Sequence, residues 1–167
     1  MNLWRQLKSL DISALWALLK LCLRHPFRVI PTIRATRECV SVCDQHFGKT
    51  HHRNSPANAF RHALWNYYIA RECNKGDGGH SKILEWTKKI TDWHEVFSKN
   101  DFLAREMDLH NNRLGRLLFG QDPNMEAEEI ITLLKSKLTT SIKISTPEDL
   151  QTVDKLMFVH LIDPKIQ

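Results

Sequence analysis

The stretch NAFRHALWNYY, residues 58–68, predicts a helix that is buried on almost every side. Asn58, His62 and Asn66 recur at intervals of four residues, so at about 100° per residue they form one line along the helix. The rest of the circumference carries apolar residues, namely Phe60, Ala63, Leu64, Tyr67 and, just beyond, Ile69. A helix that is apolar on most sides is usually buried. Polar side chains on it then need hydrogen bonds, water or a metal ion.

Helical patterns also occupy most of the chain on both sides of this stretch. They predict helices over residues 2–24, 32–47, 56–74, 81–99, 102–119 and 124–139. Pro26 and Pro31 are expected to separate the first two helices, since proline interrupts a helix interior. SIKIS, residues 141–145, alternates apolar and polar residues like a short strand. We therefore expect an all-α, compact multi-helix domain of about six to seven helices, with one short β element near 141–145.

Composition sets the broad class of the protein. With 167 residues, 42% hydrophobic and 26% charged, the chain has the make-up of one globular domain. We expect a basic amphipathic helix over 1–24 and a single helical domain over 25–167, with a polar site between 56 and 120. The four cysteines form no CxxC pair, which favours buried thiols in a reducing cytoplasm over a disulfide scaffold.

The positive charge is concentrated near the N-terminus. The net charge of the whole chain is +5. The first 37 residues contain seven Lys or Arg and only one acidic residue, Asp11. The helix over 1–24 also carries an apolar stripe that begins with Leu3, Trp4 and Leu7, so we expect peripheral contact with an anionic membrane. The alternative, that this helix simply packs on the domain, stays open. Nucleic acid is not an expected partner, because the aromatic residues occupy core-like positions.

The helix over 81–99 brings a second histidine toward the interior. Its core stripe is predicted to be Ile83, Trp86, Ile90 and Phe97. His94 falls between Ile90 and Phe97 and faces the same way, whereas Glu95 lies at the edge of the stripe. We therefore expect His94 to point inward.

A third polar group lies in MDLHNNRLGR, residues 107–116. Asp108, Asn111 and Gly115 lie along one side of the predicted helix. His110 lies beside the apolar stripe of the same helix, which is formed by Leu103, Met107, Leu114 and Leu118. A glycine inside a helix costs up to about 1 kcal/mol relative to alanine. We expect Gly115 to allow another backbone or a ligand to approach closely.

Three helices thus direct ligand-type side chains toward their buried sides, which predicts a common site. We expect His62, His94 and Asp108 to bind one divalent metal ion, with zinc, manganese and iron as candidates. The predicted catalytic residues are Glu95 as general base, Arg116 as anion clamp, and His110. The predicted binding residues are Asn58, Asn66, Asn111 and Asn112. A metal-free acid–base site built from the same histidines and carboxylates is an open alternative.

Such a site leads to two functional hypotheses. The first is a hydrolase that acts on a phosphoester or a lipid-like ester. The second is a non-enzymatic interaction module whose polar cluster is a hydrogen-bond network that specifies the packing of the core.

The motifs carry two resemblances. The order His62, His94-Glu95, Asp108 resembles the H…HD…D pattern of helical HD-type phosphohydrolases, with Glu95 in place of aspartate and a short last spacing. NAFRHALWN, HE and MDLHNNRLGR more specifically resemble a bacterial helical domain family of unknown function, with similarity over roughly residues 25–120. Similar domains also end larger secreted or toxin-like proteins. This resemblance implies a shared site in these motifs and names no reaction.

Overall fold

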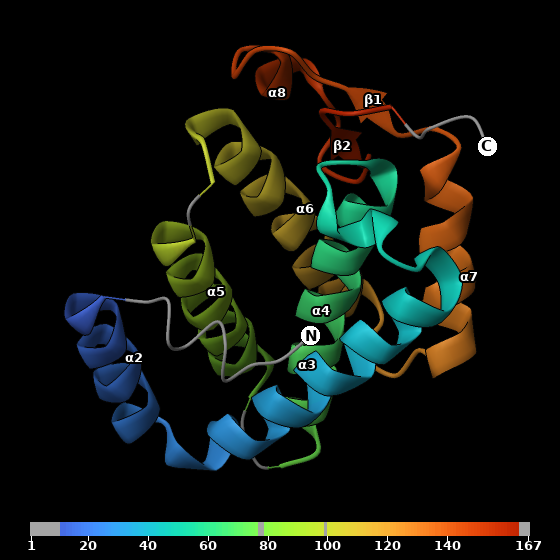
Figure 1. Cartoon of the computed structure of the whole chain (residues 1–167). Helices are drawn as coiled ribbons and strands as arrows, with labels where there is room; N and C mark the ends of the chain where they lie inside the picture. Colours follow the sequence, from blue (N-terminus) through green and yellow to red (C-terminus); the bar gives the residue numbers. More distant parts are fainter. Residues whose placement is uncertain (1–10, 77–78, 99, 164–167) are drawn as a thin grey trace.

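The computed structural model describes residues 11–76, 79–98 and 100–163, and these form seven α-helices and a two-stranded parallel sheet (Figure 1). The helices are α2 (Ile12–Arg24), α3 (Pro26–Phe47), α4 (Pro56–Asn74), α5 (His80–Phe97), α6 (Phe102–Gln121), α7 (Ala127–Leu138) and α8 (Asp149–Thr152). A 3-10 turn, η1 (Thr50–His52), precedes α4, and the strands are β1 (Ile142–Lys143) and β2 (Val159–His160). The predicted helical class and the short strand within 141–145 are confirmed. The first ten residues of the predicted N-terminal helix lie outside the described residues.

The central element is α4, which contacts α3, α5, α6, α7, η1 and β2 (Figure 1). It begins at Pro56, whose missing N–H is not needed in the first turn of a helix. Apolar side chains on several of its sides, among them Phe60, Ala63 and Ile69, are fully buried. The prediction of a core helix is confirmed, so the polar line of α4 lies in the interior.

Helices α4 and α6 cross with their backbones in close contact at Gly115. A Cβ atom added there would lie 2.1 Å from the carbonyl oxygen of Ala63. Any side chain would therefore push the two helices apart. The close approach expected at Gly115 is confirmed, and it brings the polar residues of α6 next to those of α4.

The expected separation of the first two helices by two prolines is wrong at Pro31. Helix α3 starts at Pro26 and continues through Pro31, and only His25 separates it from α2. Pro26 occupies the first helical position, where proline is favourable. Pro31 removes a hydrogen bond to the carbonyl of Phe27, but Phe27 is 93% exposed, and water can satisfy a carbonyl at such a position.

The C-terminal segment is tied to α6 through Asn111. The side chain of Asn111 donates from Nδ2 to the carbonyl of Val159 (3.0 Å) and accepts at Oδ1 from the N–H of the same residue (3.2 Å). Strand β2 pairs with β1 in the register Ile142 to Val159. Met107 of α6, Ile144 and Val159 form a small apolar cluster. The two hydrogen bonds between the Asn111 side chain and the backbone of Val159 thus hold the C-terminal segment on α6.

Within the described residues, no helix combines the length and the apolar character needed to cross a bilayer.

Candidate metal centre

His62 lies between two buried carboxylates that come from two other helices. Its Nε2 is 3.1 Å from Oδ1 of Asp108 on α6, and its Nδ1 is 3.4 Å from Oε1 of Glu95 on α5. All three residues are buried: His62 and Asp108 are each 2% exposed, and Glu95 is 1% exposed. The crossing at Gly115 lies within two turns of Asp108 and sets the distance between α4 and α6. The polar residues of three helices therefore meet around one imidazole ring.

Asn112 determines which nitrogen of His62 carries the proton. Its Nδ2 donates to Oε1 of Glu95 (2.9 Å), so its Oδ1 is the atom that faces Nδ1 of His62 (3.1 Å). This arrangement assigns a hydrogen to Nδ1, whereas Nε2 faces both Oδ1 of Asp108 and the NH2 group of Arg61. In histidines that bind metals, one ring nitrogen bonds to an orienting partner, as Nδ1 does here to Asn112, and the other nitrogen coordinates the ion.

Asp108 is held in place by two asparagines, one on each side. With its amide oriented to satisfy both neighbours, Asn58 donates to Oδ1 of Asp108 (2.9 Å) and accepts from Arg61 (2.8 Å). Asn100, two residues before α6, donates to Oδ2 of Asp108 (2.9 Å). The Asp108 side of the cluster thus approaches the surface, because Asn100 is exposed and Arg61 is half-buried.

Arg61 lies beside the imidazole, although no spacing in the sequence predicts this position. Its NH2 group is 2.8 Å from Nε2 of His62, and its Nε is buried without a hydrogen-bond partner in the part of the chain that the structure describes. The only sequence signal was its place next to His62, because Arg61 falls outside the i, i+4, i+8 line of α4. Arg61 adds a positive charge to the carboxylate cluster.

A second layer of hydrogen bonds surrounds Asn66. Its Nδ2 donates to Oδ1 of Asn112 (2.6 Å) and to the carbonyl of His62 (3.0 Å). Its Oδ1 accepts from NH1 of Arg116 (2.7 Å) and from the hydroxyl of Thr91 (3.2 Å). Arg116, predicted as an anion clamp, therefore lies behind Asn66 and is separated from the imidazole by that residue.

Burial and charge act in opposite directions on the pKa values in the cluster. Burial alone would lower the pKa of His62, but the carboxylates of Asp108 and Glu95 outweigh it and raise the pKa. Burial would raise the pKa of Glu95, yet His62 and the hydrogen bond from Asn112 lower it to about 2. For Asp108, burial and the nearby charge of Glu95 raise the pKa to about 6 despite the attraction of His62. Glu95 is therefore the ionised carboxylate, and Asp108 is the one that gains a proton more readily.

The donor set of this cluster fits a divalent metal ion. His62, Glu95 and Asp108 each offer one ligand atom, and these three atoms lie within 4.8 Å of one another. Imidazole with two carboxylates is a ligand set typical of zinc, manganese and iron. The second oxygen of Glu95, Oε2, is buried and has no hydrogen-bond partner among the described residues. A buried ionised carboxylate oxygen needs a cation or a donor, so the group is able to hold a metal.

The structure brings Glu95, and not His94, next to His62. His94 is half-buried, and its ring lies edge-on to Trp65 with ring centroids 5.2 Å apart. The inward polar line of α5 consists of Thr87, Thr91 and Glu95, all of them buried. Their spacing of four residues repeats the spacing of Asn58, His62 and Asn66. This repeated interval was the signal that could have placed Glu95 inward.

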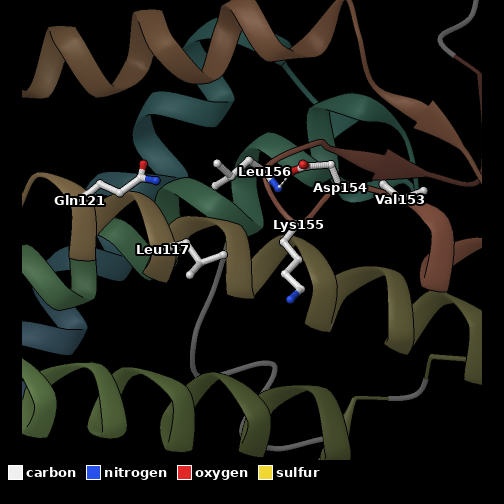
Figure 2. A pocket seen from close by; sticks show the side chains of 6 residues that line it. All are labelled: Leu117, Gln121, Val153, Asp154, Lys155 and Leu156. Carbon is white, nitrogen blue, oxygen red and sulfur yellow. Dashed lines mark hydrogen bonds between the residues drawn. The ribbon is translucent and has the colours of Figure 1, made fainter.

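Two further predicted site residues face the C-terminal segment. The Nε2 of His110 lies 2.9 Å from the carbonyl of Met157, and Asn111 bonds to Val159 as described above. The hollow drawn in Figure 2 also belongs to this side of α6 and is lined by Leu117, Gln121 and residues 153–156. Leu117 is nine residues after Asp108, which places it about 180° around the helix. The hollow and the cluster therefore lie on opposite faces of α6.

A second group of ligand-type side chains lies before α4. Asp44, His51 and His52 also bring one ligand atom each within 4.8 Å of one another. His51 is buried and bonds through Nε2 to Oδ1 of Asp44 (2.8 Å), while Asp44 and His52 are exposed. Any measurement of metal content has to separate this group from the buried cluster.

Comparison with known proteins yields one match. Residues 19–142 fit the model of a family described as a domain of unknown function, DUF6973. Neither the curated proteins nor the solved structures give a significant match. The matched range contains NAFRHALWN, the HE pair and MDLHNNRLGR, so it includes every residue of the cluster around His62. Because the model covers most of the chain, the protein belongs to the DUF6973 family.

Proposed function

We propose that the protein is a metal-dependent hydrolase in which His62, Glu95 and Asp108 bind one divalent ion, with zinc, manganese and iron as candidates. The observation that carries the proposal is Oε2 of Glu95, a carboxylate oxygen buried without a partner among the described residues, while Oε1 of the same carboxylate lies 3.4 Å from Nδ1 of His62. When bound, such an ion activates water at neutral pH and polarises a phosphoryl or ester oxygen.

The residues around the three ligands have separate roles in this proposal. Asn112 holds Glu95 and the Nδ1–H of His62, so Nε2 is the ring nitrogen that would bind the ion in place of its contact with Arg61. Asn58 and Asn100 fix the orientation of Asp108. Together these contacts preorganise the ligand atoms before any substrate binds.

Arg61 favours a phosphoester as the substrate. It is half-buried, it lies against His62, and its guanidinium is the cation nearest to Nε2 among the contacts of that ring. Guanidinium groups pair well with phosphate oxygens. In the proposal, Arg61 binds the phosphoryl group and Arg116 supports Asn66 from behind.

The test is the metal content of the full chain after it is loaded with zinc or manganese and passed through gel filtration. The proposal predicts about one retained ion per chain for the cluster. Glu95→Gln keeps the shape and removes the charge, so it should abolish this retention. Glu85→Gln is the matched control, because it makes the same change at an exposed position of the same helix. His52→Gln, measured in parallel, removes any contribution of the Asp44, His51 and His52 group.

Activity is then measured on generic phosphomonoester and phosphodiester substrates. Hydrolysis that requires the added metal and is lost in Glu95→Gln, but not in Glu85→Gln, supports the proposal. An absence of retained metal in the parent chain, with no metal-dependent hydrolysis, contradicts it.

One observation favours a second function, a hydrogen-bond network that specifies core packing. Asn66 and Asn112 are fully buried, and all of their side-chain atoms have partners. Fully satisfied buried networks can enforce a single arrangement of helices. This function predicts that Glu95→Gln lowers the thermal unfolding midpoint strongly and that zinc or manganese leaves the midpoint of the parent chain unchanged.

A further inference from the structure

The outer surface of α2 and the first turns of α3 carry several large, exposed apolar side chains. On α2, Ile12, Trp16 and Leu23 project outward at helical spacing, and Ile12 and Leu23 are 76% and 70% exposed. The face continues on α3 through Phe27 and Ile30, which are both exposed. Soluble proteins seldom expose several large apolar side chains side by side unless the surface contacts something. We call this surface the α2–α3 face.

The opposite side of α2 is already packed. Ala14 is fully buried, and its carbonyl accepts a hydrogen bond from Nε1 of Trp93 on α5 (3.2 Å). Leu18 and Leu21 pack against the core. Helix α2 lies at one edge of the molecule, beside α5 (Figure 1). The orientation of α2 is therefore fixed by the domain, and the α2–α3 face stays outward.

The charged residues of α2 and of the first three turns of α3 are all basic, whereas Asp11 caps α2 and Glu85 of α5 lies near His25 and Arg28. Residues 12–37 contain five Lys or Arg and no Asp or Glu. Lys20 and Arg24 are exposed and follow Trp16 at intervals of four residues, so they border one side of the apolar stripe. Arg34 and Arg37 are exposed further along α3.

We propose that the α2–α3 face is a docking surface for an anionic lipid membrane. An apolar stripe with a tryptophan, bordered by Lys and Arg, is the pattern of a helix that lies in the plane of the membrane interface. The absence of acidic side chains over residues 12–37 matches the negative surface of such a membrane and does not match a second copy of this basic face.

The experiment is sedimentation of the full chain with vesicles of phosphatidylcholine alone and of phosphatidylcholine mixed with phosphatidylglycerol. Binding to the anionic vesicles is expected, with little binding to the neutral ones and a loss of binding at high salt. The double variant Lys20→Glu/Arg24→Glu should weaken the partition coefficient roughly tenfold or more. Leu19 is exposed on α2, as Leu23 is, so Leu19→Glu/Leu23→Glu places two charges in the apolar stripe and should abolish binding.

Phe102→Glu is the matched control, because Phe102 is an exposed aromatic residue on a different helix, α6. It should bind like the parent chain, and circular dichroism checks that every variant is folded. The proposal is overturned if the parent chain binds neither vesicle, if it binds both equally, or if the two double variants bind as well as Phe102→Glu. It is also overturned if the parent chain is a dimer in solution that Leu19→Glu/Leu23→Glu dissociates, since a second copy would then cover the face.

Discussion

The inward line of α4 and the outward face of α2 reverse the usual placement of polar and apolar side chains. On α4, Asn58, His62 and Asn66 are buried, and each has hydrogen-bond partners. On α2, Trp16 and Leu23 are exposed although α2 is packed on its other side. Both arrangements cost stability unless something compensates for them. For α4 the compensation lies within the protein, and for α2 we propose that it comes from a partner.

Among the substitutions considered, one at Gly115, where the backbones of α4 and α6 are in contact, should reduce the stability of the protein most. Gly115→Ala places a methyl group where only 2.1 Å separates it from the carbonyl of Ala63, so α4 and α6 have to move apart. We expect a loss of about 3 kcal/mol in the free energy of unfolding. Urea denaturation measures this loss.

Gly120→Ala is the control on the same helix. The nearest atom to an added Cβ there is a side-chain atom of Leu84 at 4.0 Å. This change should be neutral or should stabilise the protein by up to about 1 kcal/mol. Equal effects at the two glycines would contradict the account of the crossing.

Removal of the amide that joins the three helices should have the next largest effect. Asn112→Leu leaves His62, Asn66 and Glu95 each without one hydrogen bond. Because a buried group that loses its partner costs about 1–3 kcal/mol, we expect a loss of about 2 kcal/mol or more in the free energy of unfolding. Asn124→Leu, at an exposed position, should change that free energy by less than about 0.5 kcal/mol. A similarly small change for Asn112→Leu would show that the network does not support the fold.

The smallest effect on stability is expected on the outward face. Phe27→Ser removes a side chain that is 93% exposed, so the free energy of unfolding should change by less than about 0.5 kcal/mol. The same substitution at Phe60, which is fully buried, should cost about 3 kcal/mol or more. Vesicle binding should show the opposite order of sensitivity, with a loss for Phe27→Ser. A large destabilisation by Phe27→Ser would mean that this face serves the fold.

The fold class and the polar line of α4 could be predicted because both follow from helical periodicity. Over residues 58–68, polar residues at every fourth position are surrounded by apolar ones, and this helical pattern predicts a buried helix without knowledge of its neighbours. Gly115 was also informative, because a glycine inside a helix lowers the stability of that helix. Its presence there therefore indicates that another backbone approaches closely.

The partners of His62 could not all be predicted, because they depend on how the helices are rotated against one another. The apolar stripe of α5 suggested that His94 faces inward, but the contact with α4 and α6 is made by Thr87, Thr91 and Glu95. Threonine is compatible with either a core or a surface position. The line of Thr87, Thr91 and Glu95 was therefore harder to recognise in the sequence than the apolar stripe that contains Trp86 and Phe97. Arg61 and Asn100 reach the cluster only through tertiary contacts, which no spacing within one helix reveals.

The most direct test of the central claim is a crystal structure of the full chain grown with zinc or manganese, with data collected at the absorption edge of that metal. The account predicts an anomalous peak at roughly 2.0–2.2 Å from one nitrogen of His62 and from one oxygen each of Glu95 and Asp108. The peak should disappear in Glu95→Gln. A structure without such a peak, in which His62 keeps its contacts with Asn112 and Asp108 and the metal binds only at Asp44, His51 and His52, would contradict the account.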